Sequence, residues 1–134
     1  MTTYEAEYDP LYVAFLYHFN IDRDYFECHE VMEQLWLEMG RLPLYQGLLQ
    51  VAVGLYHHRN GNIDGGIKLL SAAVSKLEAS EHKQMGIDMA TLIRDAREHL
   101  HHLMRHAEHP FEFCDLNIII EDDSLLQRVE SYRE

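Results

Sequence analysis

Residues 63–77 read IDGGIKLLSAAVSKL, and this stretch decides the fold class. Apolar side chains recur at Ile63, Ile67, Leu70, Val74 and Leu77. Steps of three and four residues place all five on one face of an α-helix, with polar residues on the other face. A helix of this kind is stabilised mainly by packing that apolar face against neighbouring elements. The stretch therefore predicts an amphipathic helix within a helical bundle.

The chain on either side of this stretch predicts further helices. Pro10 and Pro43 suit the first position of a helix, Gly40 suits a helix end, and Pro110 stops the helix before it. The predicted helices span about 10–19, 25–39, 43–59, 63–77 and 88–106. We expect an all-α fold: a single helical domain over residues 1–134, with a bundle of about five helices.

The C-terminal segment, about 110–134, has a different pattern. Phe111, Phe113 and the run 118–120 of three isoleucines favour an extended conformation. A short helix follows Ser124 in this prediction. We expect the segment to pack across the bundle or against another chain; a partly ordered end is the alternative.

Composition excludes several classes of function. The 134 residues carry 11 basic and 23 acidic side chains, a net charge of −12. Nucleic acids and anionic lipids bind basic surfaces, so neither is an expected partner. No apolar run approaches the ~20 residues of a membrane helix, and the N-terminus lacks the apolar core of a signal peptide. Two cysteines, Cys28 and Cys114, are too few for a disulfide framework. We therefore expect a cytoplasmic protein.

The predicted helix 25–39 carries the strongest candidate site. His29 and Glu33 lie four residues apart, so their side chains meet on the helix surface. Apolar residues flank them on both sides, Phe26 and Leu37 on the outer one, which predicts a partly buried pair. Buried ionisable groups are costly unless paired, and a site is one reason to keep them. The alternative is a structural His–Glu pair, whose loss on His29→Ala would cost about 2–4 kcal/mol.

The predicted helix 43–59 is largely apolar, with one narrow polar stripe formed by Gln46, Gln50 and His57. Gly47 and Gly54 lie beside this stripe. Glycine within a helix costs about 0.5–1 kcal/mol relative to alanine. The two glycines therefore indicate either the close approach of another backbone or room for a ligand, and the stripe is either a ligand site or the solvent face.

These residues complete a resemblance to a known family. His29, Glu33 and Trp36 match the HxxxExxW motif of the DUF309 family, small helical bacterial and archaeal proteins of unknown function. The stretch 45–50 and the region 57–70 also resemble that family, so the resemblance covers about residues 8–78. It implies an all-α bundle and no particular activity.

Two chemistries fit the candidate site. Glu33 could orient His29 as a general base towards a small ligand, making both residues catalytic candidates. Trp36, Tyr25, Gln46, Gln50 and His57 would then bind the ligand. A divalent metal is the other candidate cofactor, with His29, Glu33 and His57 as its ligands, although nothing in the spacing fixes a third ligand.

A second group of histidines lies on one flank of the predicted helix 88–106. It comprises His99, His102, His106 and His109, and the flank is expected to face mostly outward. His102 and His106 have a spacing that can chelate a transition metal, and we interpret this as adventitious binding.

Two functions of different classes follow from the sequence. The first is a small-ligand-binding or enzymatic domain centred on His29 and Glu33. The second is a structural or protein-interaction module in which the His–Glu–Trp cluster only locks helix packing. Tyrosines near the N-terminus and the β-prone C-terminal segment also predict a homodimer.

Overall fold

The computed structural model describes residues 8–81 and 85–133, and within these ranges it contains six helices and no strand beyond one isolated bridge. The helices are α1 (Pro10–Asn20), α2 (Tyr25–Glu38), α3 (Pro43–Arg59), α4 (Ile63–Ala79), α5 (Met89–Met104) and α6 (Asp123–Glu130). The all-α prediction is confirmed, and α6 is the short helix expected after Ser124.

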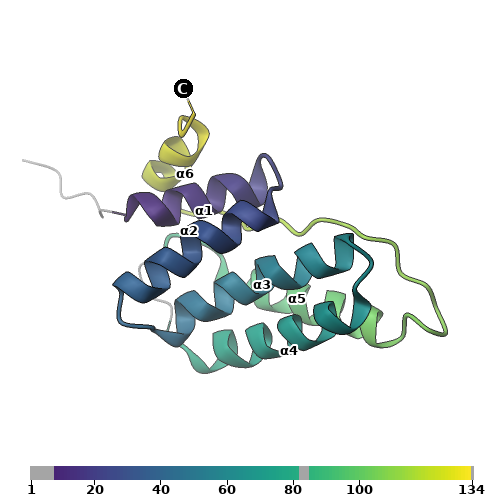
Figure 1. The fold of residues 1–134 in the computed structure, drawn as a ribbon. Coiled ribbons are helices and arrows are strands. Elements are labelled where there is room, and N and C mark those ends of the chain that lie inside the picture. Colours follow the sequence, from purple (N-terminus) through teal and green to yellow (C-terminus); the bar gives the residue numbers. More distant parts are fainter. Residues whose placement is uncertain (1–7, 82–84, 134) are drawn as a thin grey trace, which may run out of the picture.

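The helices form an antiparallel bundle with α3 at its centre. α3 packs between α2 and α4, α5 covers α4, and α1 joins α2 to the terminal helix α6. Figure 1 shows α5 behind α3 and α4, with α6 lying over α1. No described helix is long and apolar enough to cross a membrane.

Side-chain caps explain where the helices begin. The Asp24 carboxylate accepts the backbone N–H of Glu27 at the start of α2, and the Asn62 side chain accepts that of Gly65 at the start of α4. Each cap satisfies an N–H group that the helix itself leaves without a partner. At the other end of α2, Gly40 adopts a φ of +79°, which only glycine adopts without strain.

The two glycines of α3 mark close approach to α4. A Cβ on Gly54 would lie 2.7 Å from Leu70 Cγ, and one on Gly47 would lie 2.9 Å from Leu77 Cγ. Both distances are shorter than van der Waals contact. The glycines therefore let α3 and α4 pack closely, and of the two interpretations offered by the sequence, close packing is the correct one.

The C-terminal segment runs back across the bundle in an extended conformation, as expected, and Figure 1 shows it between α5 and α6. Ile87 and Ile120 form an isolated antiparallel bridge. The side-chain amide of Asn20 accepts the N–H of Ile118 and donates to its carbonyl, at 2.9 and 2.8 Å. Arg23 donates to the carbonyl of Leu116. These contacts fix the segment to the α1–α2 connection.

Candidate functional site

The predicted His29–Glu33 pair forms, but at the surface. Its Nε2 and Oε2 atoms are 2.9 Å apart, and Glu30 Oε1 lies 3.3 Å from His29 Nδ1. The side chains of His29 and Glu33 are 36% and 48% exposed. The pair is therefore only partly covered: His29 is partly buried and Glu33 is exposed. α2 buries the opposite flank, through Tyr25, Cys28, Met32 and Leu35.

The apolar residues that flank the pair are exposed as well. Phe26 is 54% exposed and Leu37 is 48% exposed, although both were expected to help cover the pair. The ring of Phe26 lies against that of Tyr56 on α3, with the two ring centroids 6.2 Å apart. We call the outer row of this helix the α2 edge; it consists of the partly buried His29 and the exposed Phe26, Glu30, Glu33 and Leu37.

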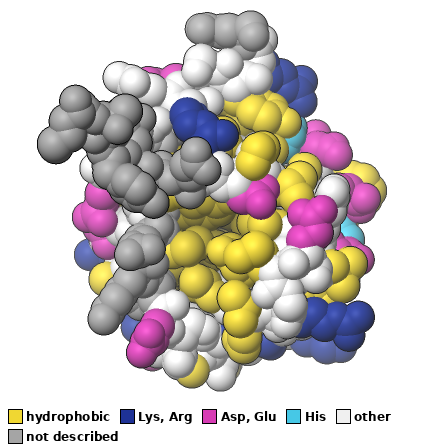
Figure 2. Space-filling view, turned by 90° about the vertical axis from the view of Figure 1, so that its left-hand side faces the viewer, with side chains coloured by type: hydrophobic (Ala, Val, Ile, Leu, Met, Phe, Trp, Pro, Cys, Tyr) yellow, Lys and Arg dark blue, Asp and Glu magenta, His cyan; other side chains and the backbone are white. Residues whose placement is uncertain are grey.

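Further exposed apolar side chains lie just beyond the α2 edge. Met39 and Leu42, in the connection from α2 to α3, are both nearly half exposed. This connection lies at the left-hand end of the bundle in Figure 1. Figure 2 views that end and shows apolar side chains gathered in a hollow, with charged side chains around it.

Two of the predicted ligand-binding residues carry polar atoms that find no partner in the described part of the chain. The indole N–H of Trp36 and the side-chain carbonyl of Gln50 are buried and make no hydrogen bond within residues 8–81 and 85–133. Arg41 stacks over the Trp36 ring at 5.7 Å. A buried polar group without a partner costs about 1–3 kcal/mol, so each of these atoms calls for an explanation.

The other predicted site residues lie apart from the pair. Tyr25 is fully buried, and its hydroxyl donates to Asp115 at 2.5 Å, on the C-terminal segment. His57 contacts Asn62 at 3.2 Å, in the α3–α4 connection. Within residues 8–81 and 85–133, no hydrogen bond or ion pair joins His29 or Glu33 to Gln46, Gln50 or His57; the last three are partly buried on α3.

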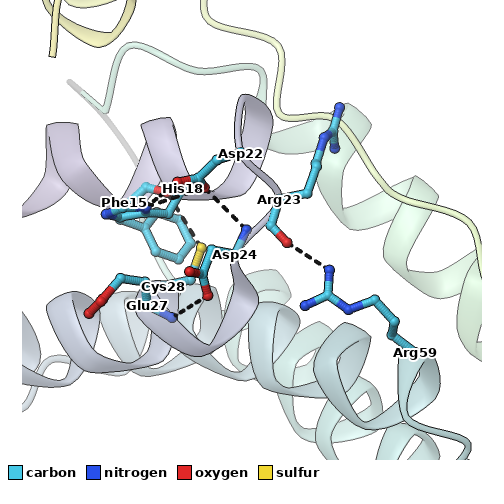
Figure 3. Close-up of polar contacts among 8 residues, drawn as sticks. All are labelled: Phe15, His18, Asp22, Arg23, Asp24, Glu27, Cys28 and Arg59. Carbon is cyan, nitrogen blue, oxygen red and sulfur yellow. Dashed lines mark hydrogen bonds and ion pairs between the residues drawn. The ribbon is translucent and has the colours of Figure 1, made fainter. Parts of the chain in front are cut away.

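Cys28 is turned away from His29 and cannot serve it as a nucleophile. Its Sγ donates to the carbonyl of Phe15, in the core between α1 and α2 (Figure 3). Burial raises the pKa of this thiol well above its ordinary value. The same view shows Arg59 of α3 donating to the carbonyl of Arg23, which holds the α1–α2 connection against α3.

A histidine pair that sequence reasoning missed lies on the other side of α3. His58 Nδ1 and His99 Nε2 are 2.8 Å apart, and both residues are buried. His58 Nε2 lies 3.1 Å from the carbonyl of Phe111. Burial lowers the pKa of both imidazoles, that of His99 to about 4. The expectation that the histidine flank of α5 faces outward is thus wrong for His99, which is 3% exposed.

His99 forms the floor of a cleft of about 220 Å³ between α5 and the C-terminal segment. We call it the α5 cleft; its lining residues are Asp95, Glu98, His99, His102, Phe111, Cys114 and Leu116. Cys114 Sγ lies 4.0 Å from His99 Nδ1. His102 stacks on Phe111, whose backbone N–H donates to His106 Nδ1 at 3.0 Å. In neutral His106 the proton is therefore on Nε2, and Nδ1 already accepts a hydrogen bond. Neither ring nitrogen is then free to chelate a metal together with His102.

A sequence signal for His58 existed. On a helical wheel of α3, His58 falls between Gly47 and Val51, on the buried side. Its partner His99 is 41 residues away, and no local pattern links the two. Across the described part of the chain, no three His, Cys, Asp or Glu side chains already converge to hold a metal ion.

Comparison with known proteins finds a family that is similar to part of this helical region. A family model described as "Domain of unknown function (DUF309)" matches residues 12–69, from α1 into α4. The resemblance predicted from the HxxxExxW motif is confirmed over this range.

The chain is also similar to the uncharacterized protein YpuF of Bacillus subtilis (strain 168). The two are 38% identical over 92 residues, which cover 64% of this chain and 52% of YpuF. The chain thus aligns with about half the length of this curated relative.

Proposed function

We propose that the chain is a protein-interaction module, and that the α2 edge docks an apolar, basic segment of a partner protein. The observation that carries this proposal is the exposure of Phe26 and Leu37, which precede and follow the His29–Glu33 pair along α2. Exposed aromatic and aliphatic side chains around a polar centre are typical of interaction surfaces.

The charge of α2 defines the chemistry of this partner. The helix contains Glu27, Glu30, Glu33 and Glu38 and no lysine or arginine. A segment with Lys or Arg between its apolar residues would complement this helix, since opposite potentials favour encounter and register. An enzymatic role for His29 is less well supported, because Glu33 is exposed and His29 only partly buried, whereas a catalytic pair is expected in an enclosed site.

A peptide pair tests the proposal directly. One labelled peptide carries apolar residues at helical spacing with lysine elsewhere, and the other carries glutamate in place of lysine. Fluorescence anisotropy is expected to show binding of the lysine peptide only. The double variant Phe26→Ser/Leu37→Ser should weaken binding more than about tenfold, and heteronuclear NMR should map the peptide onto α2.

Met104→Ser is the matched control, because Met104 is an apolar residue of α5 that is 61% exposed. It should bind the lysine peptide as the wild type does. Equal binding of both peptides, no binding at all, or unchanged binding by the double variant would each refute the proposal.

A second candidate function rests on Trp36 and Gln50. Their N–H and carbonyl groups, which find no partner within the described residues, could hydrogen-bond a small polar ligand. If Gln50 is kept for a ligand, then Gln50→Leu should leave the free energy of unfolding unchanged or raise it. A clear loss of stability would show that the amide serves the fold, and would remove this candidate.

A further inference from the structure

The α5 cleft brings a histidine and a cysteine together outside the DUF309 region. We propose that it is a zinc site in which His99 Nδ1 and Cys114 Sγ are ligands to Zn²⁺. The proposal is independent of the partner-docking function, because no residue of the α2 edge lines this cleft.

The hydrogen-bond chain through the cleft floor leaves one lone pair free on His99. A carbonyl only accepts, so the contact with Phe111 places the proton of neutral His58 on Nε2. His58 Nδ1 is then an acceptor, and His99 Nε2 must donate to it at 2.8 Å. The remaining nitrogen, His99 Nδ1, is therefore unprotonated and faces Cys114.

This arrangement matches that of histidines that bind metals. A metal-bound imidazole typically donates its other N–H to a fixed acceptor, which sets the tautomer and the orientation of the ring. Here His58 is that acceptor, and its own N–H is held by a backbone carbonyl. His58 is thus a positioning residue and not a ligand.

The separation of the two ligand atoms is close to what zinc requires. With Zn–S near 2.3 Å and Zn–N near 2.0–2.1 Å, a tetrahedral site separates sulfur and nitrogen by about 3.6 Å. The observed distance from Cys114 Sγ to His99 Nδ1 is 4.0 Å. The gap must therefore close by about 0.4 Å, a change that rotation of the exposed Cys114 side chain can supply.

The charges around the cleft favour a cation over a reactive thiolate. Asp95 and Glu98 line the cleft, and Asp115 follows Cys114 in the chain. A nucleophilic cysteine needs the opposite, an electropositive environment. When Zn²⁺ binds, the S–H bond breaks, a Zn–S bond forms, and the proton leaves to solvent.

The remaining coordination positions fall to side chains that already line the cleft and to water. Asp95 lies one helical turn before His99 and His102 lies one turn after it, both on the same flank of α5. Neither has converged on the pair in this structure. One of them is therefore recruited by a rotamer change when the ion binds, so that the affinity of the site depends on a third residue.

Cobalt substitution tests the site, because Co²⁺ bound by thiolate gives a charge-transfer band that oxygen and nitrogen ligands do not. The full-length chain, reduced and freed of metal with chelator, is titrated with Co²⁺ and then with Zn²⁺. We expect one equivalent of Co²⁺ to produce the band and Zn²⁺ to displace it. Cys114→Ser should abolish the band and lower Zn²⁺ affinity at least about tenfold, His99→Gln should do the same, and His102→Ala or Asp95→Asn should weaken binding.

His101→Ala is the matched control, since His101 is an exposed histidine of α5 outside the cleft. It should leave the band and the affinity unchanged. Absence of the band in the wild-type chain would overturn the proposal, as would its persistence in Cys114→Ser. Zn²⁺ binding that survives Cys114→Ser but disappears in His106→Ala would assign the metal to surface histidines and would also overturn it.

Discussion

Acidification should destabilise the fold through His99, and the size of the effect follows from its burial. The pKa of His99 is lowered to about 4 in the folded chain, against about 6.5 when unfolded. Between these two pKa values the unfolded chain therefore binds a proton on His99 that the folded chain does not bind. The stability contributed by neutral His99 is fully present above the unfolded pKa and is lost as pH falls towards the folded value.

The expected loss can be worked out for two accessible pH values. Linkage with these two pKa values gives about 1.4 kcal/mol between pH 7.5 and 5.5, out of a total near 3 kcal/mol at lower pH. The titratable groups around the ring are His58 from α3, Asp95, Glu98 and His102 from α5, and Cys114 from the C-terminal segment. The two carboxylates favour the imidazolium, but burial dominates, with the nearby imidazoles acting in the same direction as burial.

Urea unfolding followed by circular dichroism at the two pH values measures the effect. Other groups also titrate over this range, so the test is the difference between wild type and His99→Gln, in which the glutamine stays neutral. The wild type should lose about 1.4 kcal/mol more than the variant between pH 7.5 and 5.5. Equal losses in the two proteins would show that His99 is not held neutral by the fold, and the reasoning would fail.

Three further substitutions test the fold. Gly54→Ala should destabilise the chain by about 1–3 kcal/mol, because the new Cβ would lie 2.7 Å from Leu70 Cγ; an unchanged urea midpoint would contradict close α3–α4 packing. Asn20→Ala removes both hydrogen bonds to the Ile118 backbone and should cost about 1–3 kcal/mol, with faster amide exchange at Ile118; unaltered protection there would count against this anchor. His29→Ala should lower the free energy of unfolding by less than about 1 kcal/mol, since His29 is only partly buried and Glu33 is exposed. A loss of several kcal/mol would instead indicate that the pair serves to hold the helices together.

The helices could be predicted from sequence because their signals are local. Pro10 and Pro43 begin α1 and α3, Asn62 caps α4, and Gly40 ends α2, each acting within one turn of its own helix. The apolar stripe of α4 reports its buried face in the same way. Signals of this kind do not depend on how the neighbouring helices are arranged.

The burial of the candidate site could not be predicted in the same way. A helical wheel shows that Phe26 and Leu37 flank His29 and Glu33, and the pair indeed forms. The wheel does not show which flank a neighbouring helix covers. α2 has apolar residues on two sides but packs only one of them into the core, so the outer side is left exposed.

The contact between His58 and His99 depends on the packing of α3, α4 and α5 together. The close approach of α4 to α3 at Gly54 and Gly47 brings these helices into register, and α5 then covers α4. Spacing within α5 placed His99 on a flank but could not show that the C-terminal segment crosses it. The cleft residues Phe111 and Cys114 belong to that crossing segment, far from any helical pattern.

The family match and the α5 cleft therefore concern different parts of the molecule. Residues 12–69 contain the α2 edge and His58, whereas His99 and Cys114 lie beyond that range. The match of residues 12–69 to DUF309 thus implies nothing about zinc, and a failed cobalt titration would leave the docking proposal intact. Conversely, Phe26→Ser/Leu37→Ser removes no residue of the cleft, so loss of peptide binding with retention of the cobalt band would establish the two sites as separate. His58 links the two parts of the molecule, because it belongs to the matched region and fixes the tautomer of His99 from there.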